Sequence, residues 1–149
     1  MKHLVFLSLI SVLSFSIACS GDKAKLRGEI SNFEQEGWLD DNTFQVKAIG
    51  EPTKGDRGLR KRRLSAEANA IDVATITAVK QLLAGTKLKV EEKNFDINKL
   101  ALSADFKDAV LNGALIRKSF DVEDNCNVTY RMQRMNLKRL VEAEIAALQ

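Results

Sequence analysis

The stretch RLSAEANAIDVATITAVKQLLAG, residues 63–85, carries an alanine at every fourth position, at Ala66, Ala70, Ala74 and Ala78. This spacing places one alanine on each turn of a helix, and Gly85 is a typical C-terminal stop. We predict a helix that begins at Leu59, or at Ser65 as its N-cap, and ends at Ala84. Beside the alanine row, its predicted apolar stripe consists of Leu64, Ala68, Ile71, Thr75, Ala78, Val79 and Leu82. The alanine row is interpreted as a flat strip that lets the helix approach a sheet, or a second copy of itself, closely.

Alternating side chains on both sides of this helix predict an antiparallel sheet. Residues 26–52 are predicted to be β structure, with a strand at residues 44–49 and a hairpin turn at residues 40–42. Residues 114–122 and 126–132 alternate around the acidic turn EDN and predict a second hairpin. The alternating side chains are Phe44, Val46, Ala48, Ile116, Phe120, Val122, Cys126, Val128, Tyr130 and Met132.

The remaining segments predict shorter elements. Residues 87–92 are a candidate strand, and Ser103 is the predicted N-cap of a short helix that stops at Asn112. Asn136 is the predicted N-cap of a last amphipathic helix. One face of that helix carries Leu137, Leu140, Val141, Ile145 and Leu148, and the other carries Lys138, Arg139, Glu142 and Glu144. The predicted fold class is α+β: an antiparallel sheet packed by one long alanine-rich helix, with an additional C-terminal amphipathic helix that packs on its own sheet or against another subunit.

The first residues, MKHLVFLSLISVLSFSIACS, have the three parts of a secretory signal peptide. A short positive start precedes an uncharged apolar core at residues 4–13, and small residues follow at Ser16 and Ala18. Residues 1–18 are therefore predicted to be a signal peptide. No later apolar run has the length of a membrane span, so membrane attachment is expected to come from a lipid.

Cys19 follows the predicted cut, and SIAC resembles a lipobox, the site at which bacterial signal peptidase II cleaves before a lipid-modified cysteine. The usual lipobox has leucine where this chain has Ser16. Cys19 is the predicted lipidation site, carrying acyl chains such as palmitate; residues 19–25 are then a tether, and residues 26–149 a single α+β domain. The alternative is an ordinary signal-peptide cut at the same bond, after which Cys19 could form a disulfide with Cys126.

The composition argues against an enzyme. The single histidine, His3, lies in the predicted signal peptide, so the mature chain lacks the imidazole of Ser-His-Asp and Cys-His catalysis and of common zinc sites. We predict no catalytic residue, no cofactor and no metal. The chain carries 23 basic and 20 acidic residues, a near balance that leaves only local charge clusters to be explained.

The strongest charge feature is a basic cluster at the start of the long helix, made of Lys54, Arg57, Arg60, Lys61, Arg62 and Arg63. As a binding site, the basic cluster would take an anion: a lipid head group, an envelope glycan or the acidic face of a partner. No aromatic residues interleave with the arginines as stacking platforms, so nucleic acid is not an expected partner. Cations at a helix start oppose the helix dipole, which favours a binding role; a solvated loop is the structural alternative.

Three further features are given structural interpretations. The acidic run at residues 121–125 is interpreted as a hairpin turn, because it lacks the glycine and the distal glutamate of an EF-hand calcium loop. Cys126 is expected to be a small buried side chain. Trp38 is expected to pack in the core or to cap a hairpin rather than to stack on a glycan.

Three features coincide along the chain: the exported Cys19, the strand FQVKAIGEP leading through a basic loop into RLSAEANAIDVA, and the late hairpin with CNVTYRM. This combination, over residues 44–132, resembles the bacterial small-lipoprotein family typified by the twenty-kilodalton conserved outer-membrane lipoprotein and related to flagellar outer-membrane lipoproteins. The resemblance implies a dodecin-like α+β fold, an envelope location and a tendency to assemble, and it supplies no catalytic residues. The chain departs from the family pattern in its single glycine at the strand end and its extra C-terminal helix.

The predicted function is that of a non-enzymatic, lipid-anchored cell-envelope protein that acts by self-assembly or partner binding, in an envelope or flagellar setting. The expected location is the outer membrane, through the lipid anchor, facing either the periplasm or the outside. The expected partners are the membrane and either further copies of the chain or an envelope protein. The alternative is a small binding module for a lipid head group or a glycan that uses the basic cluster from Lys54 to Arg63.

Overall fold

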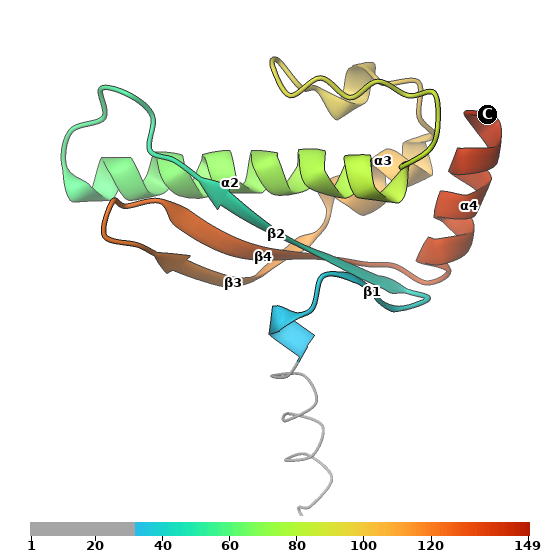
Figure 1. The fold of residues 1–149 in the computed structure, drawn as a ribbon, viewed down its shortest axis with the longest axis horizontal. Helices are drawn as coiled ribbons and strands as arrows, with labels where there is room; N and C mark the ends of the chain where they lie inside the picture. The colour runs from blue at the N-terminus through green and yellow to red at the C-terminus, as the bar shows by residue number, and fades with distance from the viewer. Residues whose placement is uncertain (1–31) are drawn as a thin grey trace, which may run out of the picture. The chain divides into compact units, whose positions relative to one another are not determined.

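The sheet at the centre of the fold has four antiparallel strands in the order β1-β2-β4-β3 (Figure 1). The computed structural model describes residues 32–149; the predicted signal peptide, Cys19 and the tether lie outside the described residues. The elements along the described chain are η1 (Asn32–Glu34), β1 (Gly37–Asp40), β2 (Thr43–Gly50), α2 (Leu59–Leu82), η2 (Ile97–Lys99), α3 (Ala104–Leu111), β3 (Ala114–Phe120), β4 (Cys126–Gln133) and α4 (Leu137–Ala147). The predicted α+β fold class, with an antiparallel sheet packed by one long alanine-rich helix, is confirmed.

Strands β2 and β4 form the central pair of the sheet. The cross-strand pairs on its buried face are Phe44–Met132, Val46–Tyr130, Ala48–Val128 and Gly50–Cys126. Their apolar side chains are at most 7% exposed, because every second side chain of a strand points to the same face. The two-residue alternation predicted for both strands is confirmed, and so is the buried position of Cys126.

The alanine row of α2 is the surface that packs on the sheet. All four alanines of the row are 0% exposed, and Figure 1 shows α2 lying along the sheet. Leu64 and Ala68 were predicted to lie in the apolar stripe, but both are exposed, Leu64 by 57%. The predicted stripe is wrong at these two positions, because the side that faces the sheet at close range has room only for small side chains.

Gly50 determines how closely α2 approaches β2. A Cβ atom added to Gly50 would lie 2.1 Å from the backbone nitrogen of Ala70 and 2.2 Å from the carbonyl oxygen of Ala66. Both distances are far below van der Waals contact, and the atoms that the Cβ would meet belong to the helix backbone. The absence of a side chain on the strand and the methyl groups on the helix therefore act together to permit this contact.

Helix α2 begins at Leu59, the earlier of its two predicted starts. Gly58 holds the N-cap position with a φ of 84°, and no side chain caps the helix there. The prediction of Ser65 as the N-cap is wrong. The Oγ atom of Ser65 accepts a hydrogen bond from the Thr53 amide (3.1 Å) and donates one to the Arg62 carbonyl (3.0 Å), which joins the β2–α2 loop to the helix.

Strand β3 contains a bulge that the alternation of its sequence did not reveal. The β3–β4 register shifts between Leu115 and Arg117, which leaves Ile116 as the extra residue. Leu115 is consequently the partner of Tyr130, on the buried side of the sheet. Val122 lies beyond the end of β3, in the turn, where it is fully exposed. The prediction that Ile116 and Val122 share the face of Phe120 is therefore wrong.

Two predicted β segments have other structures. Asn32–Glu34 form the short 3-10 helix η1. Residues 87–92 form no strand; they belong to the loop between α2 and α3, in which Leu88 and Val90 pack against the core. Alternating apolar residues therefore do not always indicate a strand, because they also occur in a loop that packs on the core.

Helices α3 and α4 lie side by side at one end of the sheet (Figure 1). The Oγ atom of Ser103 accepts a hydrogen bond from the Phe106 amide (3.2 Å), so the predicted N-cap of α3 is confirmed. Asn136 holds the N-cap position of α4, but with a φ of 59° and without a capping side-chain bond. Leu137 and Val141 are buried, so the apolar face of α4 packs within its own chain.

Glu144 was predicted to lie on the polar face of α4, and this prediction is wrong. Glu144 is only 6% exposed, and its carboxylate accepts hydrogen bonds from the Ser103 amide (3.0 Å) and the Ser103 hydroxyl (2.5 Å). A buried carboxylate needs such donors, because burial removes its hydration. The carboxylate of Glu144 thereby connects α4 to the start of α3.

Candidate functional site

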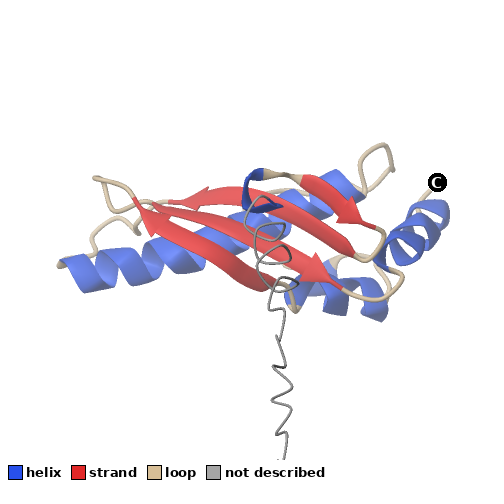
Figure 2. Cartoon of the chain, turned by 90° about the horizontal axis from the view of Figure 1, so that it is seen from below, coloured by secondary structure: helices blue, strands red, loops and turns tan. Residues whose placement is uncertain are grey.

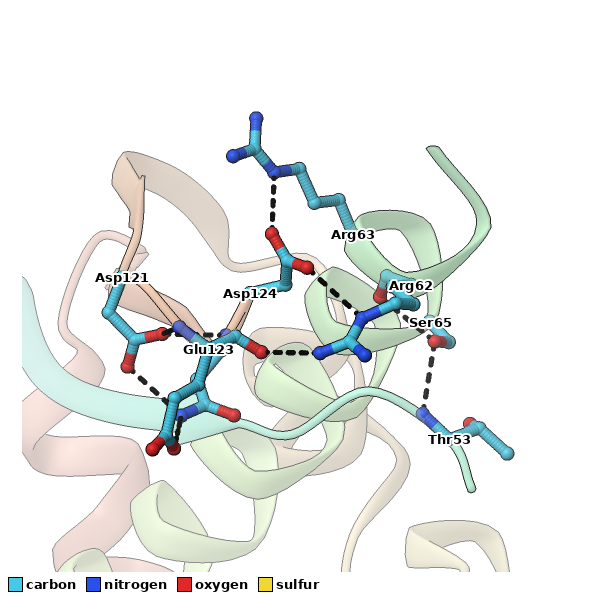
Figure 3. Close-up of polar contacts among 8 residues, drawn as sticks. Thr53, Arg62, Arg63, Ser65, Asp121, Glu123 and Asp124 are labelled. Carbon is cyan, nitrogen blue, oxygen red and sulfur yellow. Dashed lines mark hydrogen bonds and ion pairs between the residues drawn. The ribbon is translucent and has the colours of Figure 1, made fainter. Parts of the chain in front are cut away.

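The predicted basic cluster lies where the β2–α2 loop and the start of α2 meet the turn between β3 and β4 (Figure 3). An open cleft of about 490 Å³ lies at this junction, lined by residues 51–56 together with Arg62, Glu123 and Asn125. The lining carries charges of both signs. The basic cluster is thus partly neutralised by acidic residues of its own chain.

Arg62 and Arg63 fasten the start of α2 to the β3–β4 turn (Figure 3). Their Nε atoms lie 3.0 Å and 3.3 Å from the two carboxylate oxygens of Asp124, and Arg62 also donates to the Glu123 carbonyl (2.8 Å). The Arg63 guanidinium lies over the ring of Phe120, 5.0 Å from its centroid. These two arginines have a structural role, which the sequence could not reveal because Asp124 lies about sixty positions away along the chain.

The acidic turn is held by hydrogen bonds within itself. Asp121 accepts hydrogen bonds from the amides of Glu123 (2.9 Å) and Asn125 (3.0 Å), and from the Asn125 side chain (2.9 Å). The Asn125 side-chain bond is the main cause that lowers the pKa of Asp121. Within residues 32–149, no cluster of three or more His, Cys, Asp or Glu side chains could hold a metal ion.

In the described part of the chain, the basic cluster divides into three paired and three unpaired cations. Besides Arg62 and Arg63, Lys61 is paired, with Asp56 at 3.0 Å. Among the described residues, no ion pair is formed by Lys54, Arg57 or Arg60, which lie in the loop and the first turn of α2. The part of the predicted anion site that is free to bind a ligand is therefore reduced to these three cations.

A second candidate site lies on the face of the sheet opposite α2, which we call the open face. Figure 2 shows the strands in front of α2, and no α-helix of residues 32–149 covers this side. Because side chains alternate, the residues of the open face form rows across β2, β4 and β3. Two such rows are Lys47–Thr129–Arg117 and Ile49–Asn127–Ser119. A cleft of about 360 Å³ lies over these two rows.

The carboxylate of Glu34, from η1, lies over the first row of the open face. One of its oxygens is 2.8 Å from Nζ of Lys47, and the other is 2.6 Å from a guanidinium nitrogen of Arg117. The hydrogen bond from Lys47, together with the charges of Lys47 and Arg117, lowers the pKa of Glu34. Thr129, between the two cations, is only 4% exposed.

The other residues of the segment 33–36, which we call the strap, also contact the open face. The Arg131 guanidinium lies over the ring of Phe33, 5.8 Å from its centroid. The side chain of Gln45 donates to the carbonyl of Gln35 (2.6 Å), and the carboxylate of Glu36 accepts from the amide of Lys47 (2.8 Å). The strap is therefore held by its main chain as well as by its side chains.

Tyr130 and Cys126 are buried in the core, and Trp38 packs against it. The Tyr130 hydroxyl donates to the Val110 carbonyl (2.8 Å), and burial raises the pKa of Tyr130. Burial is also the main cause that raises the pKa of the Cys126 thiol, which disfavours the reactive thiolate. Trp38 packs edge-on against Phe44, with ring centroids 5.1 Å apart, as expected for a side chain of the hairpin core.

Comparisons with models of known protein families, with curated proteins and with solved structures give no match to this chain. The resemblance to small lipoproteins accordingly stays a prediction. No helix of residues 32–149 combines the length and the apolar character that crossing a membrane requires.

The sequence analysis missed the open-face site. Glu34, Lys47 and Arg117 are separated by 13 and 70 positions, and each looks like an ordinary surface charge. The one available signal was the alternation of residues 44–49, which places Lys47 and Ile49 together on the face opposite the core. No local pattern could place Arg117 beside them, because its position depends on the bulge at Ile116.

Proposed function

We propose that this protein is a non-enzymatic, lipid-anchored protein of the cell envelope that acts by binding a partner protein through its open face. The observation that carries the proposal is the second row of that face, which no α-helix of residues 32–149 covers and in which Ile49 is 58% exposed beside Asn127 and Ser119 in the lining of the 360 Å³ cleft. A cleft of about 360 Å³ lies within the size range of ligand sites, and the centre of an interface buries exposed apolar side chains. The signal-like start and Cys19 support the envelope location.

The lipid anchor is tested by the intact mass of the protein extracted from membranes. We expect the native protein to have lost residues 1–18 and to carry acyl chains on Cys19, while a Cys19→Ser form lacks them. A native mass that fits the cleaved chain without acyl chains would overturn the lipid anchor. That result would not affect the proposed binding at the open face, which is tested separately by crosslinking.

Partner binding is tested by replacing Ile49 with the photocrosslinker p-benzoylphenylalanine in the full-length protein in cells. We expect one discrete adduct, whose second component is identified by mass spectrometry. The matched control places the same crosslinker at Leu64, which is equally exposed at 57% but lies on α2. Equal adducts from both positions, or none from position 49, would refute the open face as the binding surface. An adduct of two identical chains would instead assign the open face to self-assembly.

A second candidate function is binding of an anionic ligand such as a lipid head group. It is supported by Lys54, Arg57 and Arg60, which form no ion pair with any residue of 32–149. They lie beside the uncapped N-terminus of α2, whose first turn contains no acidic residue. Anions are stabilised at such a position by the helix dipole and by nearby cations.

For this second function, we expect salt-sensitive retention of the protein on anionic lipid vesicles, reduced by at least tenfold when these three residues are changed to glutamine. The control is the triple variant Lys61→Gln, Arg62→Gln and Arg63→Gln, which removes the same number of charges from residues already paired with Asp56 or Asp124. The control should reduce retention less. Equal loss in both variants would indicate a nonspecific effect of net charge and would exclude the three cations as the site.

A further inference from the structure

The first row of the open face is built to hold a carboxylate. Lys47 and Arg117 lie on β2 and β3, the two neighbours of β4, and both pair in register with Thr129. Adjacent strands lie about 4.8 Å apart, so the two cations stand roughly 10 Å apart at their backbones with a small side chain between them. Their long side chains converge over Thr129 and bind the two oxygens of one carboxylate, at 2.8 Å and 2.6 Å.

The carboxylate in that position is held by ion pairs that are exposed to solvent. The side chains of Lys47, Arg117 and Glu34 are 38%, 58% and 69% exposed, so solvent screens both ion pairs. Gly37, the first residue of β1, has a φ of 92°, and a Cβ atom added to it would meet nothing within 4 Å, so the chain turns from the strap into the strand in open space. Because the strap lies on the face opposite the core, a segment that replaced it would leave the core contacts of β2 and β4 in place.

We propose that the strap occupies a peptide-binding site in cis, and that the ligand of this site in trans is an acidic segment of a partner protein, with an aromatic residue followed by a glutamate. Lys47 and Arg117 recognise the glutamate, and Arg131 recognises the aromatic ring. This inference rests on the proposed function and gives the chemistry of the same open face.

The contacts of the strap favour a peptide over a free anion or a lipid head group. Gln45 binds a main-chain carbonyl of the strap, and the Lys47 amide binds the carboxylate of Glu36. The ring of Phe33 adds a contact with Arg131 that an isolated anion could not make. The row that contains Ile49 extends the cleft beyond the residues that the strap contacts. A partner segment longer than the strap would bury that apolar side chain as well.

The test measures binding of the acetylated and amidated peptide NFEQE, the sequence of residues 32–36, to the full-length protein by calorimetry and NMR titration. We expect Glu34→Gln to bind the peptide at least tenfold more tightly than the native protein, because the cis carboxylate no longer competes. Adding Lys47→Met and Arg117→Met to that variant should remove the gain. The peptide NFQQQ should bind at least tenfold more weakly than NFEQE.

A matched control is Lys80→Met in the Glu34→Gln background, which removes a cation from an exposed surface ion pair with Glu92 on the other side of the molecule. This control should leave peptide binding unchanged. The thermal midpoint of every variant shows whether the variant is folded at the temperature of the titration.

Three results would overturn the proposal: equal affinity of the native protein and Glu34→Gln for NFEQE, equal binding of NFQQQ, or a fall in thermal stability of Glu34→Gln without any peptide binding. A native dimer that Lys47→Met and Arg117→Met dissociate would identify a second copy of the chain as the occupant, which also contradicts a partner protein. If position 49 crosslinks a partner but NFEQE does not bind, the proposed function survives and only the proposed ligand chemistry fails. If NFEQE binds but position 49 forms no adduct, the peptide site over the first row stands and the row that contains Ile49 is excluded from the binding surface.

Discussion

Gly50→Ala is expected to lower the free energy of unfolding by about 3 kcal/mol, which corresponds to a fall of roughly 10 °C in the thermal midpoint. The added methyl group would lie 2.1 Å and 2.2 Å from backbone atoms of Ala70 and Ala66. Backbone atoms cannot rotate away as a side chain can, so α2 must move away from β2 as a whole. Such a shift opens gaps along the whole helix–sheet contact. Thermal and urea unfolding of the variant measure this cost.

The control for this prediction is Gly55→Ala. Gly55 has a φ of 92°, but a Cβ atom at Gly55 would meet nothing within 4 Å. The expected cost is about 1 kcal/mol, since an L-residue is strained at positive φ even where space is available. A Gly50→Ala protein as stable as the native one, or one affected no more than Gly55→Ala, would show that the close approach of α2 to β2 does not support the fold.

Ala70→Leu is expected to destabilise the protein by about 2–3 kcal/mol, because the larger side chain would have to enter the contact that Gly50 and Ala70 share. The matched variant Ala68→Leu makes the same chemical change two residues earlier in the same helix, at an exposed position. Its effect should stay within about 0.5 kcal/mol, as at most surface positions. The difference between the two urea midpoints tests the assignment of the packed face directly. Two equal effects would contradict it.

Helix α2 shows how far sequence reasoning reaches on this protein. The spacing of its alanines correctly predicted a helix that approaches a sheet closely, and Leu59 was one of its two predicted starts. The predicted apolar stripe nevertheless included Leu64, which is exposed, because hydrophobicity alone favours the larger side chain. The close contact also depends on a residue of another element: a Cβ atom on Gly50 of β2 would meet the backbone of Ala66 and Ala70.

For the polar residues, too, the sequence identified the side chains but not their partners. The sequence identified the six cations of the basic cluster, yet Arg62 and Arg63 are bound by Asp124 across the molecule. The sequence placed Glu144 on the polar face of α4, but in the structure its carboxylate is buried and accepts hydrogen bonds from the amide and the hydroxyl of Ser103. In both cases the partner lies more than forty positions away, beyond the reach of any local pattern.

By itself, the sequence determined the order of the elements, the buried faces of β2 and β4 and the α+β class, because periodicity within one strand or helix depends only on neighbours along the chain. The signal-like start, Cys19 and the absence of histidine after His3 are likewise properties of the sequence alone. Tertiary structure alone decided which apolar residues of α2 stay exposed, which cations are already paired, and that Lys47 and Arg117 bracket the carboxylate of Glu34. The physical reason is that strand register is a non-local property: pairing β2 and β3 with β4 brings residues 47 and 117 into one row, and no short segment of the chain contains that information.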